Sequence, residues 1–289
     1  MFSWLVCLVM ILGGILWRPL GLPKDGYWNF LGGAFVLLII ISAATRKRTL
    51  RKLAIKLLTE QQKIVEAGQN LHPADPADFP HLDLNFYRKT QDFFTGHGYM
   101  LLGDFRLEAP SPQSDPRCFI RVMAAPDGSS LVQVYQPRPS WKATAGLKLF
   151  GSTPRKYGDT IELNAEFNDG TFLELSNCPA VESLSQPPGC RVYVMPIATP
   201  PEKLCEEFRK LTDGYSASHP GIVALPVSDR TGFLAFHARR AARSAEYRRS
   251  IGYITREELL RNGAKQPLAD QLYQEIQKLQ KEIVREELP

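Results

Sequence analysis

The stretch that decides the fold is YWNFLGGAFVLLIIISAAT at residues 27–45, which is followed directly by RKRTLRKLAIK at residues 46–56. No Asp, Glu, Lys, Arg or His stands between Asp25 and Arg46. At about 1.5 Å per residue, a helix over this interval reaches about 30 Å, the thickness of the hydrocarbon core of a bilayer. We therefore predict a transmembrane helix that the basic residues stop at the membrane surface.

A second apolar stretch precedes this one. Residues 2–17, FSWLVCLVMILGGILW, carry no charged side chain, and residues 18–26, RPLGLPKDG, contain the prolines and glycines of a tight turn. Together the two stretches predict a helical hairpin in the membrane, with spans at about 2–17 and 27–45. A signal peptide is the alternative for residues 2–17, but no Lys or Arg precedes them and no A-x-A-like cleavage site follows.

The basic residues set the expected direction of the hairpin. Cations accumulate on the cytoplasmic side of membrane proteins, and the segment after residue 45 carries many more of them than the turn does. We therefore predict a multi-pass protein of the plasma (inner) membrane with its soluble domain in the cytoplasm. The residues expected to contact the surface of the lipid bilayer are Arg46, Lys47, Arg48, Arg51 and Lys52.

The rest of the chain has the composition of a soluble body. Charged residues make up 22% of the sequence, and the mean hydropathy is −0.19 even though the N-terminal stretches are strongly apolar. This balance excludes a polytopic transporter. We divide the chain into a transmembrane hairpin (1–45), a basic juxtamembrane helix (46–70), a Pro-rich linker (71–82), an α+β domain (83–215) and a helical C-terminal region (216–289).

The cysteines and histidines give no metal or redox motif. The five cysteines contain no CxxC pair, so we predict separate reduced thiols, no metal site and no cofactor. A disulfide between Cys178 and Cys190 is the alternative if the domain lies in an oxidising compartment. His72 and His81 flank the Pro-rich linker, and we interpret them as solvated linker residues rather than metal ligands.

Two segments with similar turns predict β-hairpins. In the second, IELNAEFNDGTFLEL at 161–175, a three-residue loop with a left-handed Gly170 pairs Leu163 with Leu175 and keeps one face apolar. The same loop length in the first, CFIRVMAAPDGSSLVQVYQ at 118–136, pairs Ile120 with Val134.

The chosen register of the second hairpin places Glu162, Asn164, Glu166 and Glu174 together on its other face. Paired carboxylates can act as general acid and base, which makes the three glutamates candidates for catalysis. A half-exposed antiparallel sheet also has a polar outer face by default, and we prefer this interpretation.

Helix signals surround the hairpins. Asp83 or Asn85 can cap a short helix, Thr199 and Glu202 fit a capping box, and so do Thr255 and Glu258. Further strands are expected at 99–107 and 191–197, joined to the hairpins as an antiparallel meander. The predicted fold class is α+β: a transmembrane helical hairpin, then an antiparallel sheet with helices on one face, then a helical C-terminal region.

Basic residues are the remaining candidates for contacts. The segment 137–158 mixes cations with aromatic residues, and the helix expected near 233–247 is rich in arginine. Solvated surfaces explain both, but they also fit contact with a partner or an anion. The candidate residues for such contacts are Trp141, Lys142, Lys148, Arg155, Lys156, Arg239, Arg240 and Arg243.

The last segment, 267–287, repeats apolar residues at steps of four and three. This spacing fits a helix that docks on the domain or one that pairs with a second chain, so a protein partner or self-association is expected.

The common catalytic motifs are absent from the sequence: G-x-S-x-G, the Walker loop, H-E-x-x-H and S-x-x-K. The leading hypothesis is therefore a membrane-anchored binding or scaffold protein without enzymatic activity. The alternative is a membrane-bound enzyme, for example a hydrolase, with a pocket between sheet and helices and with the acidic face or His97 as candidates. Binding of nucleic acid through the basic segments is the third and least favoured hypothesis.

Overall fold

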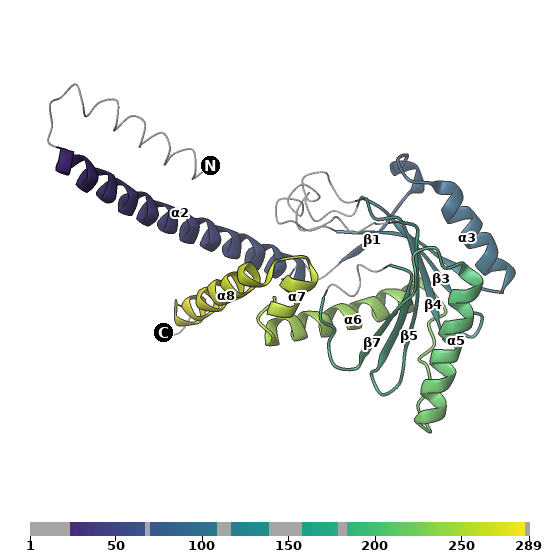
Figure 1. Cartoon of the computed structure of the whole chain (residues 1–289). Helices are drawn as coiled ribbons and strands as arrows, with labels where there is room; N and C mark the ends of the chain where they lie inside the picture. Colours follow the sequence, from purple (N-terminus) through teal and green to yellow (C-terminus); the bar gives the residue numbers. More distant parts are fainter. Residues whose placement is uncertain (1–23, 67–69, 109–116, 139–157, 179–183, 287–289) are drawn as a thin grey trace. The chain divides into compact units, whose positions relative to one another are not determined.

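The computed structural model describes residues 24–66, 70–108, 117–138, 158–178 and 184–286, except for the side chains of 24–44 and 283–286 (Figure 1). The described residues form one seven-stranded sheet and six α-helices, which confirms a mixed α+β fold. They divide into two compact units: residues 58–273 form one, and the described parts of 1–57 and 274–289 form the other.

The smaller unit contains most of α2 (Lys24–Glu66) and the end of α8 (Gln266–Glu286). Nη2 of Arg51 in α2 lies 2.7 Å from Oε2 of Glu282 in α8. Ala54, Ile276 and Leu279 are buried. The apolar spacing of the last helix is therefore used, at these positions, for burial within the chain.

The predicted span 27–45 lies in α2, whereas the predicted span 2–17 lies outside the described residues. Within the part of the chain that the structure describes, no helix combines the length and the apolar content that crossing a membrane requires.

The sheet belongs to the larger unit, and its strands lie side by side in the order of the chain. Neighbouring strands are antiparallel except for the last pair, in which β7 runs parallel to β6. This corrects the prediction of a fully antiparallel meander: the connection after β6 returns the chain to the same end of the sheet. The strands are β1 (Leu71–Pro73), β2 (Met100–Leu107), β3 (Ile120–Ala124), β4 (Leu131–Tyr135), β5 (Thr160–Glu166), β6 (Phe172–Ser176) and β7 (Cys190–Val194).

The two hairpins have different loops. In the β5–β6 hairpin, Leu163 pairs with Leu175 and Gly170 has a φ of +80°, as predicted. In the β3–β4 hairpin, Ile120 pairs with Tyr135 rather than with Val134, so the predicted register is wrong by one residue. The side chain of Asp127 accepts hydrogen bonds from the backbone and hydroxyl of Ser129, and this draws Ser129 into the loop.

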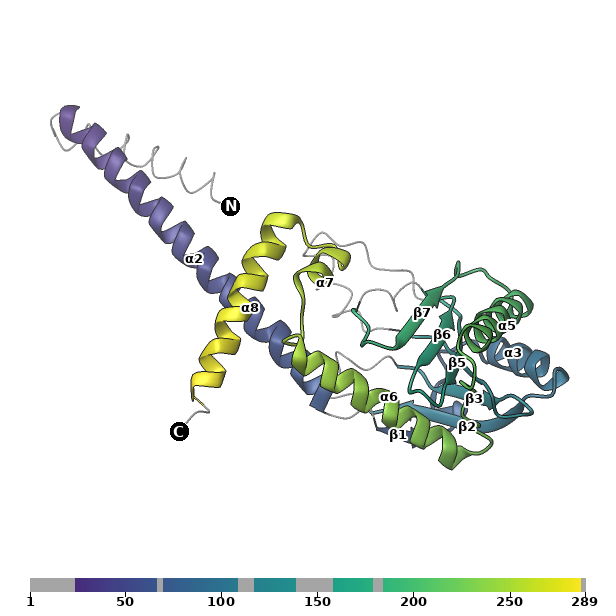
Figure 2. The same cartoon turned by 90° about the horizontal axis from the view of Figure 1, so that it is seen from below.

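Helices cover both faces of the sheet, which corrects the prediction of helices on one face (Figure 2). On one face, α3 (Leu84–Gly96) and α5 (Pro201–Ser218) contribute Tyr87, Phe94, Leu204 and Phe208 to the main apolar core. On the other face, α6 (Arg230–Ser250) packs Phe233 and Phe236 into a second core. The acidic face of the sheet is therefore covered by α6 and not by water.

The first residues of three helices test the predicted N-caps. Thr255 forms the predicted capping box with Glu258 at the start of α7 (Arg256–Arg261). The predicted box at Thr199 is wrong: α5 begins after Pro200 with no side-chain cap, and the Thr199 hydroxyl donates to the carbonyl of Pro196. Asp83 caps α3 as predicted.

Residues 71–82, predicted as a linker, belong to the folded unit. They include β1, which pairs with β2, and the short 3-10 helix η1 (Pro76–Asp78). Phe79 and Leu82 are buried in the main core. Two apolar side chains at the end of the segment therefore fix it to the domain despite its prolines.

Candidate functional site

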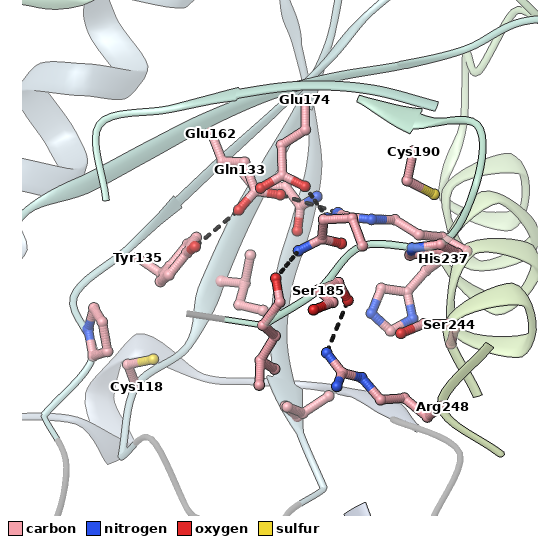
Figure 3. A pocket seen from close by; sticks show the side chains of 18 residues that line it. Cys118, Gln133, Tyr135, Glu162, Glu174, Ser185, Cys190, His237, Ser244 and Arg248 are labelled. Carbon is pink, nitrogen blue, oxygen red and sulfur yellow. Dashed lines mark hydrogen bonds and ion pairs between the residues drawn. The ribbon is translucent and has the colours of Figure 1, made fainter. Parts of the chain in front are cut away.

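A cavity of about 370 Å³ lies between α6 and the sheet (Figure 3). Its polar wall combines Gln133, Tyr135, Glu162 and Glu174 of the sheet with His237, Arg240, Ser244 and Arg248 of α6. Leu107, Ile120, Leu184, Pro187 and Ala241 supply an apolar wall. The cavity thus has the polar and apolar surfaces typical of a small-molecule site.

Strand and helix periodicity bring these side chains together. Gln133 pairs with Glu162 across β4 and β5, and Asn164 pairs with Glu174 across β5 and β6, so all four lie on the face of the sheet that α6 covers. On α6, His237, Arg240, Ser244 and Arg248 follow one another at steps of three or four residues, which places them on one side of the helix.

Arg240 links the two buried glutamates of the cavity. Its Nη1 lies 3.1 Å from Oε1 of Glu162 and 3.2 Å from Oδ1 of Asn164, and its Nη2 donates to Oε2 of Glu174. Glu162 also accepts from the hydroxyl of Tyr135 at 2.9 Å and from Nδ2 of Asn164 at 3.0 Å. One guanidinium therefore bridges two carboxylates, and both oxygens of Glu162 have donors.

Glu174 differs from Glu162 in one respect. Its Oε1 is buried and has no hydrogen-bond partner among the described residues. The side chain is only 4% exposed. Burial raises the pKa of Glu174 to about 8, with the nearby Glu162 adding to the rise and Arg240 opposing it. A buried carboxyl oxygen without a donor costs free energy unless another molecule supplies one.

The neighbouring groups are held neutral by their surroundings. Burial and the Arg240 guanidinium lower the pKa of His237 to about 4. Burial, together with the carboxylate of Glu162, raises the pKa of Tyr135 well above its ordinary value. Burial also raises the pKa of the Cys190 thiol. Near neutral pH, Tyr135, Cys190 and His237 are therefore uncharged, and the Glu174 carboxyl, with its pKa of about 8, is mostly protonated.

A second buried ion pair fixes the wall formed by residues 184–187. Nη1 of Arg248 lies 2.5 Å from Oε1 of Glu258, and Nη2 of Arg248 donates to the carbonyl of Ser185 at 2.9 Å. The amide of Ser185 donates to Glu258 at 2.6 Å. Both charged side chains are at most 5% exposed. This pair ties the segment before β7 to α6 and α7.

Two further arginines of α6 contact the sheet beside the cavity. Arg239 makes a two-pronged pair with the buried Glu166, with Nε 2.9 Å from Oε1 and Nη2 2.5 Å from Oε2. Arg243 donates to the carbonyl of Gly170. Gly189 has a φ of +80°, a conformation that favours glycine, and a Cβ on it would lie 2.6 Å from Nη2 of Arg243, so that side chain would have to move.

The structure places the predicted contact residues in three ways. Arg239, Arg240 and Arg243 lie together on α6, and each contacts the sheet. Trp141, Lys142, Lys148, Arg155 and Lys156 lie outside the described residues. Arg46, Lys47, Arg48, Arg51 and Lys52 are exposed on α2, where Arg51 pairs with Glu282.

Sequence reasoning missed Tyr135, His237, Ser244 and Arg248 as residues of the site. The available signal was the helical spacing of the polar residues on α6, which marks a polar stripe. The predicted acidic face contributes Glu162 and Glu174 to the cavity, while Glu166 lies outside its lining.

His97 lies elsewhere, at a second cavity of about 670 Å³ that it lines with Tyr99, Asp127, Cys205 and Arg209. Its Nδ1 lies 2.8 Å from the carbonyl of Phe93. Cys178 and Cys190 are free thiols, so the alternative of a disulfide between them is not realised. Among the described residues, no group of histidine, cysteine and acidic side chains could hold a metal ion.

Comparisons with protein families, with curated proteins and with solved structures found no match.

Proposed function

We propose that the chain is a membrane-tethered binding protein whose α+β domain takes up a small molecule in the cavity beneath α6. The observation that carries this proposal is the side chain of Glu174, which lines the cavity and whose buried Oε1 lacks a donor among the described residues. A bound molecule with a donor group would supply the missing hydrogen bond. The apolar wall would hold the rest of that molecule.

The membrane tether is the second part of the proposal, and the uncharged stretch 27–45 with the cations after it supports it. We expect the full-length chain, produced in bacteria, to remain with the membranes after an alkaline wash and to dissolve in detergent. A chain that begins at residue 46 should be recovered in the soluble fraction. Full-length protein in the soluble fraction would contradict the tether.

A matched pair of alanines tests the cavity. Ala241 lines it, whereas the next residue, Ala242, is exposed on the same helix. We expect small-molecule fragments to bind the wild-type chain and the Ala242→Trp variant, and not the Ala241→Trp variant, whose indole fills the space. Ligand-detected NMR on the detergent-solubilised full-length chain measures this. Equal binding by all three proteins would rule out the cavity as the site.

A second candidate function is a membrane-bound enzyme in which Glu174 transfers a proton. The pKa of about 8 favours it, because a general acid works best when its pKa is close to the working pH. Chemical conversion of a bound fragment, detected by mass spectrometry and abolished in Glu174→Gln, would favour the enzyme over the binding protein.

A further inference from the structure

We infer that the cavity selects a small organic cation: an ammonium group on an apolar body, with the ammonium held by Glu174. This inference rests on the proposed binding function and specifies the class of ligand.

The cluster holds more acidic than basic side chains. Glu162 and Glu174 share a single guanidinium, that of Arg240. The other arginine of the cavity, Arg248, is matched by Glu258. When both glutamates of the cluster are ionised, the described residues of the cavity carry one negative charge without a counterpart. A monovalent cation completes the balance, and an anion makes it worse.

The group that Glu174 lacks is a hydrogen-bond donor. Oε1 of Glu174 is a buried acceptor without a donor among the described residues, whereas both oxygens of Glu162 already accept. An ammonium group has three donors and no acceptor, so it can fill this position without leaving an acceptor of its own buried. Hydrogen bonds between charged partners are also the stronger ones.

The apolar wall of the cavity fits the carbon body of such a ligand. Leu107, Ile120, Leu184 and Ala241 line the same cavity, and its volume of about 370 Å³ accommodates more than an ammonium ion. Burying the carbon skeleton of an organic amine against this wall removes apolar surface from water, which favours binding. A bare inorganic cation would leave the wall unused.

The test uses three probes that share one ring and differ in the head group: benzylammonium, benzyl alcohol and benzoate. We expect the full-length chain in detergent to bind benzylammonium at least about tenfold more tightly than the other two, because only this probe supplies a charged donor. In Glu174→Gln, benzylammonium should lose about tenfold in affinity or more, while benzyl alcohol should keep its affinity.

A measurement on the wild-type chain complements the variant. At pH 7 the Glu174 carboxyl, with its pKa of about 8, is mostly protonated, so binding of a cation beside it should release close to one proton. Calorimetry in two buffers with different ionisation enthalpies counts that proton. The titratable and charged groups that line the cavity with Glu174 are Cys118, Tyr135, Glu162, Cys190, His237, Arg240 and Arg248.

The outcomes separate the inference from the proposal it rests on. Preference for benzylammonium, its loss in Glu174→Gln and the release of a proton would support the inference. Binding of benzyl alcohol or benzoate as tight as that of benzylammonium would overturn the ligand class and leave the binding function standing. Unchanged affinity in Glu174→Gln, or binding without proton release, would overturn the contact with Glu174. No binding of any probe would overturn both the inference and the proposed function.

Discussion

Replacing Arg240 with leucine is expected to lower the free energy of unfolding by about 3 kcal/mol at pH 7. The change leaves Glu162 and Glu174 buried without their shared cation. This loss lies at the lower end of the range that is usual when one partner of a buried ion pair is removed. The reasons are that the Arg240 guanidinium is 28% exposed and that Glu174 can take up a proton. The loss in free energy of unfolding should be larger at pH 9, because keeping Glu174 of the variant protonated costs more free energy at the higher pH.

Chemical denaturation of the full-length chain in detergent, followed by circular dichroism, measures this loss. Arg249 is exposed on the same helix, so Arg249→Leu serves as the control and should change stability by less than about 0.5 kcal/mol. The triple variant Arg240→Leu, Glu162→Gln, Glu174→Gln should recover most of the loss, because it removes the unpaired charges together with the cation. A small effect of Arg240→Leu, or a failure of this rescue, would show that the three side chains do not form one cluster.

Replacing Arg248 with methionine is expected to cost about 3–5 kcal/mol, which is the usual range when one partner of a fully buried pair is removed. Arg248 bonds to Glu258 and to the carbonyl of Ser185, so the variant leaves a buried carboxylate and a backbone acceptor without this donor. Because the same contacts hold residues 184–187 at the cavity, we also expect weaker binding of fragments.

The neighbouring residue provides the control for this variant. Arg249→Met changes an exposed arginine one position away and should leave both stability and binding as in the wild type. Adding Glu258→Gln to Arg248→Met should restore part of the stability, since it removes the unpaired charge. The amide oxygen can still accept from one of the two backbone N–H groups, of Ser185 and Thr255, that Glu258 satisfies. Equal stability of Arg248→Met and Arg249→Met would contradict the buried pair.

The hairpins show how far the sequence could predict the fold. In β5–β6, apolar and polar residues alternate, so only one register keeps the leucines on one face, and the predicted register was confirmed. In β3, Val122, Met123 and Ala124 are consecutive and all fully buried, since helices cover both faces of the sheet. A strand that is apolar on both faces gives no preference for one register, and the loop length then depended on Asp127 and Ser129.

The candidate site shows what local patterns cannot reveal. The acidic face of β5 and β6 and the arginines of α6 each have the pattern of a solvated surface when considered alone. They bury one another, although Glu162 and Arg240 are 78 positions apart. The complementary charges were visible in the sequence, but the pairing depended on which face of the sheet the later helix covers. The prediction of a solvated acidic face failed for this reason.

The raised pKa of Glu174 sets the direction in which stability changes with pH. It rises from the ordinary 4.5 to about 8 in the folded chain, so the stabilisation present below pH 4.5 is lost as the pH rises through 8. His237 acts the other way: its pKa falls from 6.5 to about 4, so its stabilisation is present above pH 6.5 and is lost as the pH falls through 4. Between pH 6.5 and 8 we therefore expect the free energy of unfolding of the wild type to fall by about 2 kcal/mol. The Glu174→Gln variant should not show this decrease.

The most direct test of the account is the titration of the Glu174 carboxyl itself. Carboxyl ¹³C NMR of the full-length chain labelled at glutamate measures it, and the loss of one resonance in Glu174→Gln assigns the signal. The buried oxygen beneath α6 predicts a carboxyl that titrates near pH 8. A Glu174 signal that titrates close to 4.5, as an exposed glutamate does, would contradict the buried cavity and the binding function built on it.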